Sequence, residues 1–142
     1  MPLETLSIDD VLLINQRVVD DARKSDRPIA VQRGTCVDPT IKDRRLLESA
    51  IARQHAGSNG RLYYATPELN AATLMYGLAK NHAFVDGNKR TALVAMLNHL
   101  DRNHVTLGNV SWRELEEVVL DVVMGVLPDR IRLRHAAAKS PD

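Results

Sequence analysis

The sequence predicts an all-α protein with a single domain and about six helices. Three observations support this: several segments repeat apolar residues every three or four positions, good capping residues precede them, and no convincing series of alternating strands occurs. The chain has 142 residues, 44% apolar and 26% charged, which is the size and composition of one globular domain and excludes wholesale disorder. We expect one domain over residues 1–142, with its core at 6–127 and a C-terminal helix and tail at 128–142.

The charge balance and the cysteine count exclude several classes of protein. A net charge of +1 argues against binding nucleic acid or a membrane through bulk charge, so no direct DNA binding is expected. One Cys excludes an internal disulfide framework and a multi-Cys zinc site. No apolar run reaches the length of about 18 residues needed to cross a membrane, and the N-terminus carries acids where a signal peptide carries bases. We therefore expect a cytoplasmic protein.

The first helix is expected from about residue 7, where Ser7 and Asp10 form a capping box with the shorter acid. Residues 24–40 are typical of a loop because they hold prolines and a glycine, and alternation at Ile29 and Val31 suggests a small strand. The apolar stripe of the first helix recurs at helical spacing and consists of Val11, Ile14, Val18 and Ala22.

A second helix is expected over residues 43–56. Asp43 is its predicted N-cap, and Gly57 is predicted to close it in a left-handed conformation. A turn should follow at residues 58–60, because serine, asparagine and glycine favour turns.

The next two helices are the most apolar of the chain. Thr66 is the predicted N-cap of the third helix and Pro67 its first residue, where the missing N–H costs nothing. Residues 69–79 are apolar almost all round, so this should be the central buried helix. The fourth is expected over residues 89–102, with Asn103 ending it in a left-handed conformation.

The C-terminal part is expected to hold two more helices. Ser111 and Glu114 form a second capping box at the start of the first of them. A final short helix is expected after Pro128, and the last few residues look frayed.

The informative stretch is residues 82–91, His-Ala-Phe-Val-Asp-Gly-Asn-Lys-Arg-Thr, which separate the two most apolar helices. Gly87 allows the backbone to approach a ligand closely. Asn88, Lys89 and Arg90 then fall at the start of a helix, where unpaired N–H groups and the positive end of the dipole favour an anion. The two cationic side chains suit a di- or triphosphate.

Two further residues of this stretch can do chemistry. Asp86 is a hard oxygen ligand that could hold Mg²⁺ against phosphates, and His82 can act as a general base near neutral pH. The motif residues have a more ordinary interpretation as well. His82 could cap a helix, Asp86 could belong to a common Asp-Gly turn, and Lys89 and Arg90 could be a solvated surface pair. Phe84 is a core anchor under either interpretation. The complete pattern of these residues is a more specific sign of function than any one of them alone.

That spacing, H-x-F-x-D-G-N-K-R, resembles the signature of the Fic/Doc family, H-x-F-x-[DE]-[AG]-N-[GK]-R. With Lys89 in the variable place, the chain looks like the Doc (death-on-curing) branch. Residues 46–50 and 76–81 also look like Doc-type flanking helices, and the similarity covers roughly residues 6–107. Ala83 departs from the proline that many members carry, which should change loop stiffness more than chemistry.

The resemblance implies a role for each motif residue. His82 would take the proton from a target hydroxyl, and Asp86 would coordinate Mg²⁺ that bridges the nucleotide phosphates. Phe84 would anchor the loop in the core. The other residues would bind phosphate: Gly87 and Asn88 as an anion hole, and Lys89 and Arg90 as cations.

The Doc branch further implies transfer of the γ-phosphate of a nucleoside triphosphate, with ATP as the expected substrate, to a hydroxyl of a target protein. Its target class is a translation elongation factor, and the consequence is growth arrest. A cognate antitoxin would inhibit in trans, since the self-inhibitory pattern [ST]-x-x-x-E-[GN] of some Fic proteins has no match here. Two alternatives stay open: nucleotidyl (AMP) transfer, and a non-enzymatic phosphate-binding module.

A small flap that aligns a target peptide by strand addition is expected in either of two segments, 27–38 or 61–65. The remaining candidates are weaker. His99 and His104 lack a convincing third metal ligand, and Cys36 is interpreted as a passive thiol. A solvated basic face, or alternatively an antitoxin or target contact, is expected at Arg130, Arg132 and Arg134.

Overall fold

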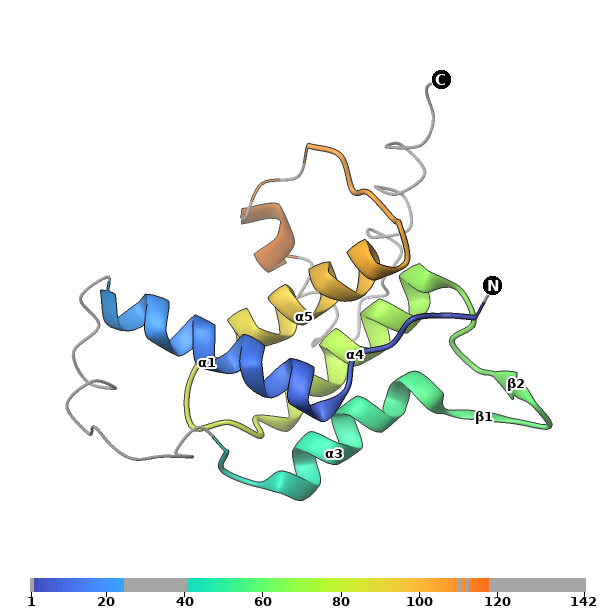
Figure 1. Ribbon diagram of the computed structural model, residues 1–142, viewed down its shortest axis with the longest axis horizontal. Coiled ribbons are helices and arrows are strands. Elements are labelled where there is room, and N and C mark those ends of the chain that lie inside the picture. Colours follow the sequence, from blue (N-terminus) through green and yellow to red (C-terminus); the bar gives the residue numbers. More distant parts are fainter. Residues whose placement is uncertain (1, 25–40, 110, 112, 118–142) are drawn as a thin grey trace.

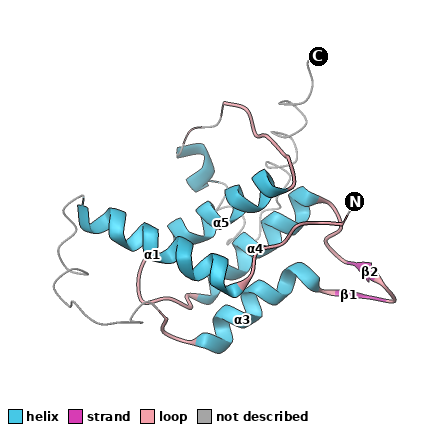
Figure 2. Cartoon of the chain, viewed as in Figure 1, coloured by secondary structure: helices cyan, strands magenta, loops and turns pink. Residues whose placement is uncertain are grey.

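The computed structural model describes residues 2–24, 41–109, 111 and 113–117. This part is mostly helical with one small two-stranded sheet, which confirms the all-α prediction with a small flap (Figure 1, Figure 2). The expected strand at Ile29 and Val31 and the expected helix and tail at 128–142 lie outside the described residues. In chain order the elements are α1 (Ile8–Lys24), α3 (Arg44–Ala52), the 3-10 turn η1 (Arg53–His55), β1 (Gly57–Ser58), β2 (Arg61–Leu62), α4 (Pro67–Asn81) and α5 (Asn88–Arg102).

Helix α4 is the centre of the fold, as its sequence predicts. Its residues are buried almost without interruption from Asn70 to Ala79, because α5 packs along it and α3 packs against it as well. Helix α1 crosses over α5 and completes the described core (Figure 1). Burial of such apolar side chains is the main favourable term in folding. The largest fully buried side chains include Leu47, Leu74, Met75, Leu78, Phe84 and Met96.

The predicted helix starts are confirmed. Asp43 accepts hydrogen bonds from the backbone N–H groups of Arg45 and Leu46, so it caps α3. Thr66 caps α4 by accepting from the N–H of Leu69 at 3.2 Å, with Pro67 at the first helical position. Reciprocal capping boxes form at both expected places, Ser7 with Asp10 and Ser111 with Glu114.

The prediction that Gly57 closes the second helix in a left-handed conformation is wrong. The helix ends in the 3-10 turn η1, Ala56 is extended, and Gly57 belongs to β1. A Cβ at Gly57 would lie 2.1 Å from the carbonyl oxygen of Arg61, so the close approach of the two strands requires glycine here. Positive φ angles instead occur at Asn59 (53°) and Gly60 (77°), the conformation of a two-residue hairpin turn.

The prediction that Asn103 ends α5 in a left-handed conformation is also wrong. Asn103 has φ −98°, and the positive φ falls on His104 at 60°. The reason is a distant partner: the Asn103 amide pairs with both backbone groups of Glu4, each at 2.9 Å. Gln54 does the same for Leu6, at 2.9 and 3.0 Å. The side chains of Asn103 and Gln54 thus bond to backbone groups as a neighbouring strand would, and they hold the segment that leads into α1.

His99 is buried next to Asn70, whose side chain also contacts the backbone of Gln54. The Asn70 amide nitrogen donates to the carbonyls of Gln54 and Tyr64, so its oxygen faces the Nε2 of His99 at 2.7 Å, and Nε2 must carry the proton. Burial lowers the pKa of His99 to about 4, and the nearby charge of Arg102 acts in the same direction. His99 is therefore a neutral structural residue.

We expect acid to destabilise the protein through His99. Between pH 6.5 and about 4 the unfolded chain binds a proton that the folded chain does not, so the free energy of unfolding falls as the pH falls. The loss should be at most about 3 kcal/mol. Urea denaturation across this range would measure it, with His99→Gln as the control, because glutamine keeps an N–H donor but does not ionise. An equal loss in both proteins would contradict the assignment to His99.

Candidate active site

The motif loop, defined here as residues 82–88, connects the C-terminal end of α4 to the N-terminal end of α5. His82 follows α4 in the left-handed conformation, with φ 51° and ψ 49°, and its side chain is exposed. Gly87 precedes α5 in the same region, with φ 77° and ψ 18°. Left-handed backbone at a non-glycine residue is uncommon, although histidine is among the residues that tolerate it. The loop thus begins with an exposed imidazole and ends at the start of α5.

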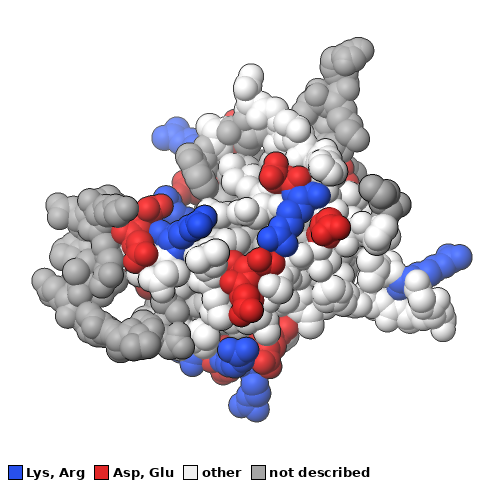
Figure 3. Space-filling model, viewed as in Figure 1, with Lys and Arg blue, Asp and Glu red and all other residues white. Residues whose placement is uncertain are grey.

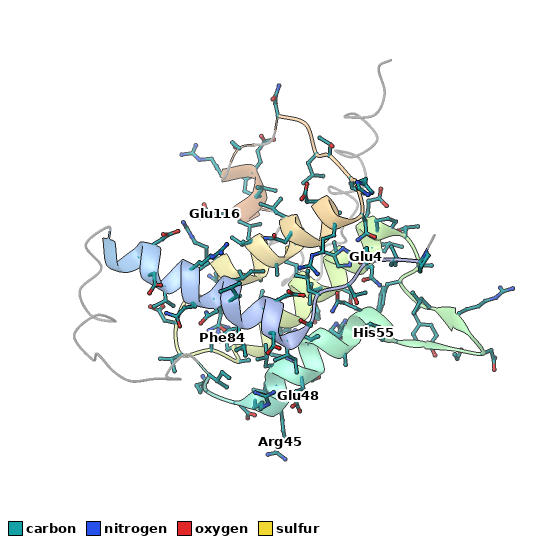
Figure 4. All side chains as sticks on the ribbon, in the orientation of Figure 1. Glu4, Arg45, Glu48, His55, Phe84 and Glu116 are labelled. Atoms are coloured by element: carbon teal, nitrogen blue, oxygen red, sulfur yellow. The ribbon has the colours of Figure 1, made fainter. Side chains whose placement is uncertain are left out.

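Phe84 and Asn88 give the loop its shape. Phe84 is almost fully buried, which confirms its predicted place in the core (Figure 4). The Asn88 Oδ1 accepts from the Phe84 N–H at 3.0 Å, and the Asn88 Nδ2 donates to the Phe84 carbonyl at 2.9 Å. Because its amide is used in this way, Asn88 could contribute to an anion hole only through its backbone N–H.

The segment that precedes α3 holds the other side of the loop. The carbonyl oxygen of Ala83 accepts from the N–H groups of Lys42 at 2.7 Å and Asp43 at 3.1 Å. Ile41 and Phe84 form an isolated antiparallel bridge. A segment far from the loop in sequence, residues 41–43, therefore helps to fix the loop backbone.

Asn15 of α1 is a residue of this site that sequence analysis missed. Its Nδ2 donates to the carbonyl oxygen of Asp86 and to the Oγ1 of Thr91, both at 3.0 Å. A signal was present in the sequence: Asn15 lies four residues after Val11 and three before Val18, which places a polar side chain on the buried stripe of the first helix.

Three charged residues of the motif, Asp86, Lys89 and Arg90, lie where the loop meets α5. Asp86 is half-buried, and its Oδ1 accepts from the Gly87 N–H at 2.8 Å. Lys89 and Arg90 are exposed in the first turn of α5, where N–H groups and the helix dipole favour anions. The Arg90 guanidinium also lies 4.0 Å from the carboxylate of Glu116, a residue of the short helical segment 113–117 (Figure 4).

These residues fit a magnesium ion that is bound together with a substrate. Mg²⁺ is commonly held by one or two carboxylates plus phosphate oxygens and water. Asp86 supplies one carboxylate, and its Oδ2 has no hydrogen bond from the described residues. Within those residues no group of three or more His, Cys, Asp or Glu side chains could hold a metal ion.

The face of the molecule drawn in Figure 3 has mixed charge. In the face shown in Figure 3, acidic and basic side chains of the described residues lie interspersed, as expected for a net charge of +1. Binding of an anion would therefore depend on the local groups of the loop and not on a field of one sign.

The two segments considered for a target-aligning flap differ in position. The hairpin β1–β2, which contains Arg61, precedes the first turn of α4, whereas His82 follows its last turn (Figure 1). The 15 residues of α4 separate these ends by about 22 Å. Segment 61–65 therefore starts far from His82. Segment 27–38 lies outside the described residues, although Ile41, shortly after it, touches the motif loop.

A family model described as the Fic/DOC family matches residues 5–100, which include the whole motif loop. The chain belongs to the Fic/DOC family. It is 45% identical over 67 residues to Toxin Doc of Mycolicibacterium smegmatis (strain ATCC 700084 / mc(2)155). That alignment covers 47% of this chain and 52% of the relative, so it spans about half the length of the curated protein. No solved structure matches.

Membership of the Fic/DOC family confirms the resemblance that the motif suggested. The matched range contains α1, α3 and α4 and nearly all of α5, the elements that hold the loop. No helix among the described residues is long and apolar enough to cross a membrane.

Gly87 and Gly60 provide a matched test of how tightly the loop is packed, because both have φ 77°. A Cβ at Gly60 would meet nothing within 4 Å, whereas one at Gly87 would lie 3.1 Å from the Cγ1 of Val18. Gly60→Ala should lower the free energy of unfolding by about 1 kcal/mol through backbone strain alone. Gly87→Ala should cost about 1 kcal/mol more, from crowding. Urea denaturation would measure both, and equal losses would show that Val18 does not restrict this loop.

Proposed function

We propose that this Fic/DOC protein is a Doc-type toxin that transfers the γ-phosphate of a nucleoside triphosphate, such as ATP, to a hydroxyl of a target protein. One observation carries the proposal: a single short loop joins the exposed His82, at the end of α4, to the N-terminus of α5, whose first turn carries exposed Lys89 and Arg90. The similarity to a protein named Toxin Doc supports the toxin role.

In the proposed reaction the target oxygen attacks the γ-phosphorus, and the bond from that phosphorus to the β–γ bridging oxygen breaks. The nucleoside diphosphate leaves with the electron pair, and the hydroxyl proton passes to His82. The exposure of His82 suits this role, because a protein side chain must reach it from solvent. The backbone N–H groups that begin α5 would stabilise the phosphate charge.

Asp86 would hold Mg²⁺ against the phosphates through its carboxylate, and the ion would supply neutralisation of their charge. The carboxylate is suitable because, among the described residues, only the Gly87 N–H donates to it, at Oδ1, which leaves Oδ2 for the ion. Arg90 would bind phosphate oxygens after leaving Glu116, whose carboxylate is 4.0 Å away and mostly solvated, so the exchange is inexpensive.

Lys89 favours phosphoryl over nucleotidyl transfer. It directly follows Asn88, in the place where adenylylating Fic proteins carry a small residue with room for a phosphate close to the helix start. A long cationic side chain restricts which phosphate can occupy that space, and in the Doc branch it accompanies γ-phosphate transfer. Only Lys89 therefore argues against the alternative of AMP transfer.

The likeness to a Doc toxin also suggests the partners. We propose a translation elongation factor as the target, with arrest of protein synthesis as the result. A cell that makes such a toxin needs an inhibitor, and we propose a cognate antitoxin that acts in trans in the cytoplasm.

The two transfer reactions can be separated by labelling. We expect label from γ-³²P-ATP, and not from α-³²P-ATP, on a protein of the translation machinery when the chain and Mg²⁺ are added to a cell extract. Lys89→Gly should lower this labelling, because it removes the charge that orients the phosphates. Transfer of the α-label by the wild-type chain would instead assign it to nucleotidyl transfer, and no transfer of either label would favour a binding module.

Expression of the wild-type chain alone should arrest growth, and His82→Ala should relieve the arrest. Loss of a general base typically slows a reaction by about 10²–10⁴-fold. His104→Ala is a matched control, because His104 is also exposed and has φ 60°, but it lies after α5 and outside the motif. Circular dichroism would verify that both variants fold. A folded His82→Ala protein that still arrests growth would remove His82 from the role of base.

A further inference from the structure

The position of Asn15 is not explained by the proposed chemistry. It is fully buried in α1 among apolar side chains that include Val11 and Val18. Its Nδ2 donates to the Asp86 carbonyl and to the Thr91 hydroxyl. Its Oδ1 is equally buried and accepts no hydrogen bond from the described residues. A buried acceptor without a partner carries a free-energy cost, so the arrangement needs a reason.

The orientation of the amide indicates what the side chain recognises. If the amide were turned around, Oδ1 would face the carbonyl oxygen of Asp86, and two acceptors would meet. The observed orientation keeps the bond to Asp86 at 3.0 Å and leaves Oδ1 without a donor among the described residues. Asn15 therefore stabilises one orientation of the Asp86 carbonyl.

Fixing this carbonyl also fixes a neighbouring donor. The C=O of Asp86 and the N–H of Gly87 belong to one planar trans peptide, so they point in opposite directions. Because Asn15 holds the C=O toward α1, the Gly87 N–H must point away from α1. There it donates to the Asp86 Oδ1 at 2.8 Å, and a bound phosphate oxygen would take the place of this carboxylate oxygen.

The Asp86–Gly87 peptide needs such a restraint. Glycine adopts positive and negative φ with similar ease, so a peptide plane next to it can rotate at low cost. Asn15 opposes that rotation from α1. Its second bond, to Thr91, ties the same amide to the next turn of α5.

We propose that Asn15 is a positioning residue that fixes the Asp86–Gly87 peptide plane and so directs the Gly87 N–H at a phosphate oxygen of the nucleoside triphosphate. The identity of the ligand rests on the proposed function. The orientation of the peptide does not, because it follows from contacts of the ligand-free chain.

The test compares Asn15→Leu with Thr91→Val. Both remove a polar partner from the same buried cluster, but only Asn15→Leu removes the bond to Asp86. The first measurement is the NMR signal of the Gly87 amide in the free, full-length protein. The second is titration calorimetry with ATP and Mg²⁺.

Asn15→Leu should move the Gly87 amide resonance strongly and weaken ATP binding about tenfold, the effect of one hydrogen bond to a charged group. Thr91→Val should stay close to the wild type in both measurements. If Asn15→Leu does not fold, Asn15→Ala replaces it, since it removes the donor without adding bulk.

Each result can be assigned. An unchanged Gly87 signal in the Asn15 variant would overturn the positioning role, as would an equal effect of Thr91→Val. If the wild-type chain binds no ATP, the proposed function fails, and the Gly87 signal alone then decides whether Asn15 sets the peptide plane. A displaced Gly87 signal with unchanged ATP affinity would overturn the part of the proposal that concerns phosphate.

Discussion

The pair of hydrogen bonds between the Asn88 amide and the backbone of Phe84 is the interaction on which the site depends. The chain must reverse between two buried helices in a few residues, and its peptide groups need partners when they lie against a core. Asn88 supplies both a donor and an acceptor to Phe84, at 2.9 and 3.0 Å, while the phenyl ring fills the core. The loop is thus held in shape by hydrogen bonds between two of its own residues.

The same solution recurs through the described part of the molecule. Carboxamide side chains carry one donor group and one acceptor, so they can replace a strand or helix as partners of isolated peptide groups. Gln54 and Asn103 do this for the segment before α1, and Asn15 supplies a donor alone to the motif loop. A small helical domain can in this way hold irregular segments rigidly without a larger sheet.

Rigidity on one side of the loop permits chemistry on the other. Phe84, Ala83 and the Asp86 carbonyl face the protein, whereas His82, Lys89 and Arg90 are exposed. In the proposed function, binding energy for the phosphates comes from donors that are already oriented, so little reorganisation accompanies the reaction. The charged groups of the motif are few and local, and the chain as a whole has a net charge of only +1.

The sequence by itself determined two things: the helices that have strong local signals, and the family. The caps at Ser7, Asp43 and Thr66 act within a few residues, and the motif from His82 to Arg90 is continuous. Tertiary structure decided what depends on residues far apart. Gly57 entered a hairpin because a strand approaches it closely, and Asn103 kept an ordinary φ because Glu4 engages its side chain. Asn15 gained its place at the site only when α1 packed beneath a loop 71 residues away, since a hydrogen bond over that separation has no local pattern.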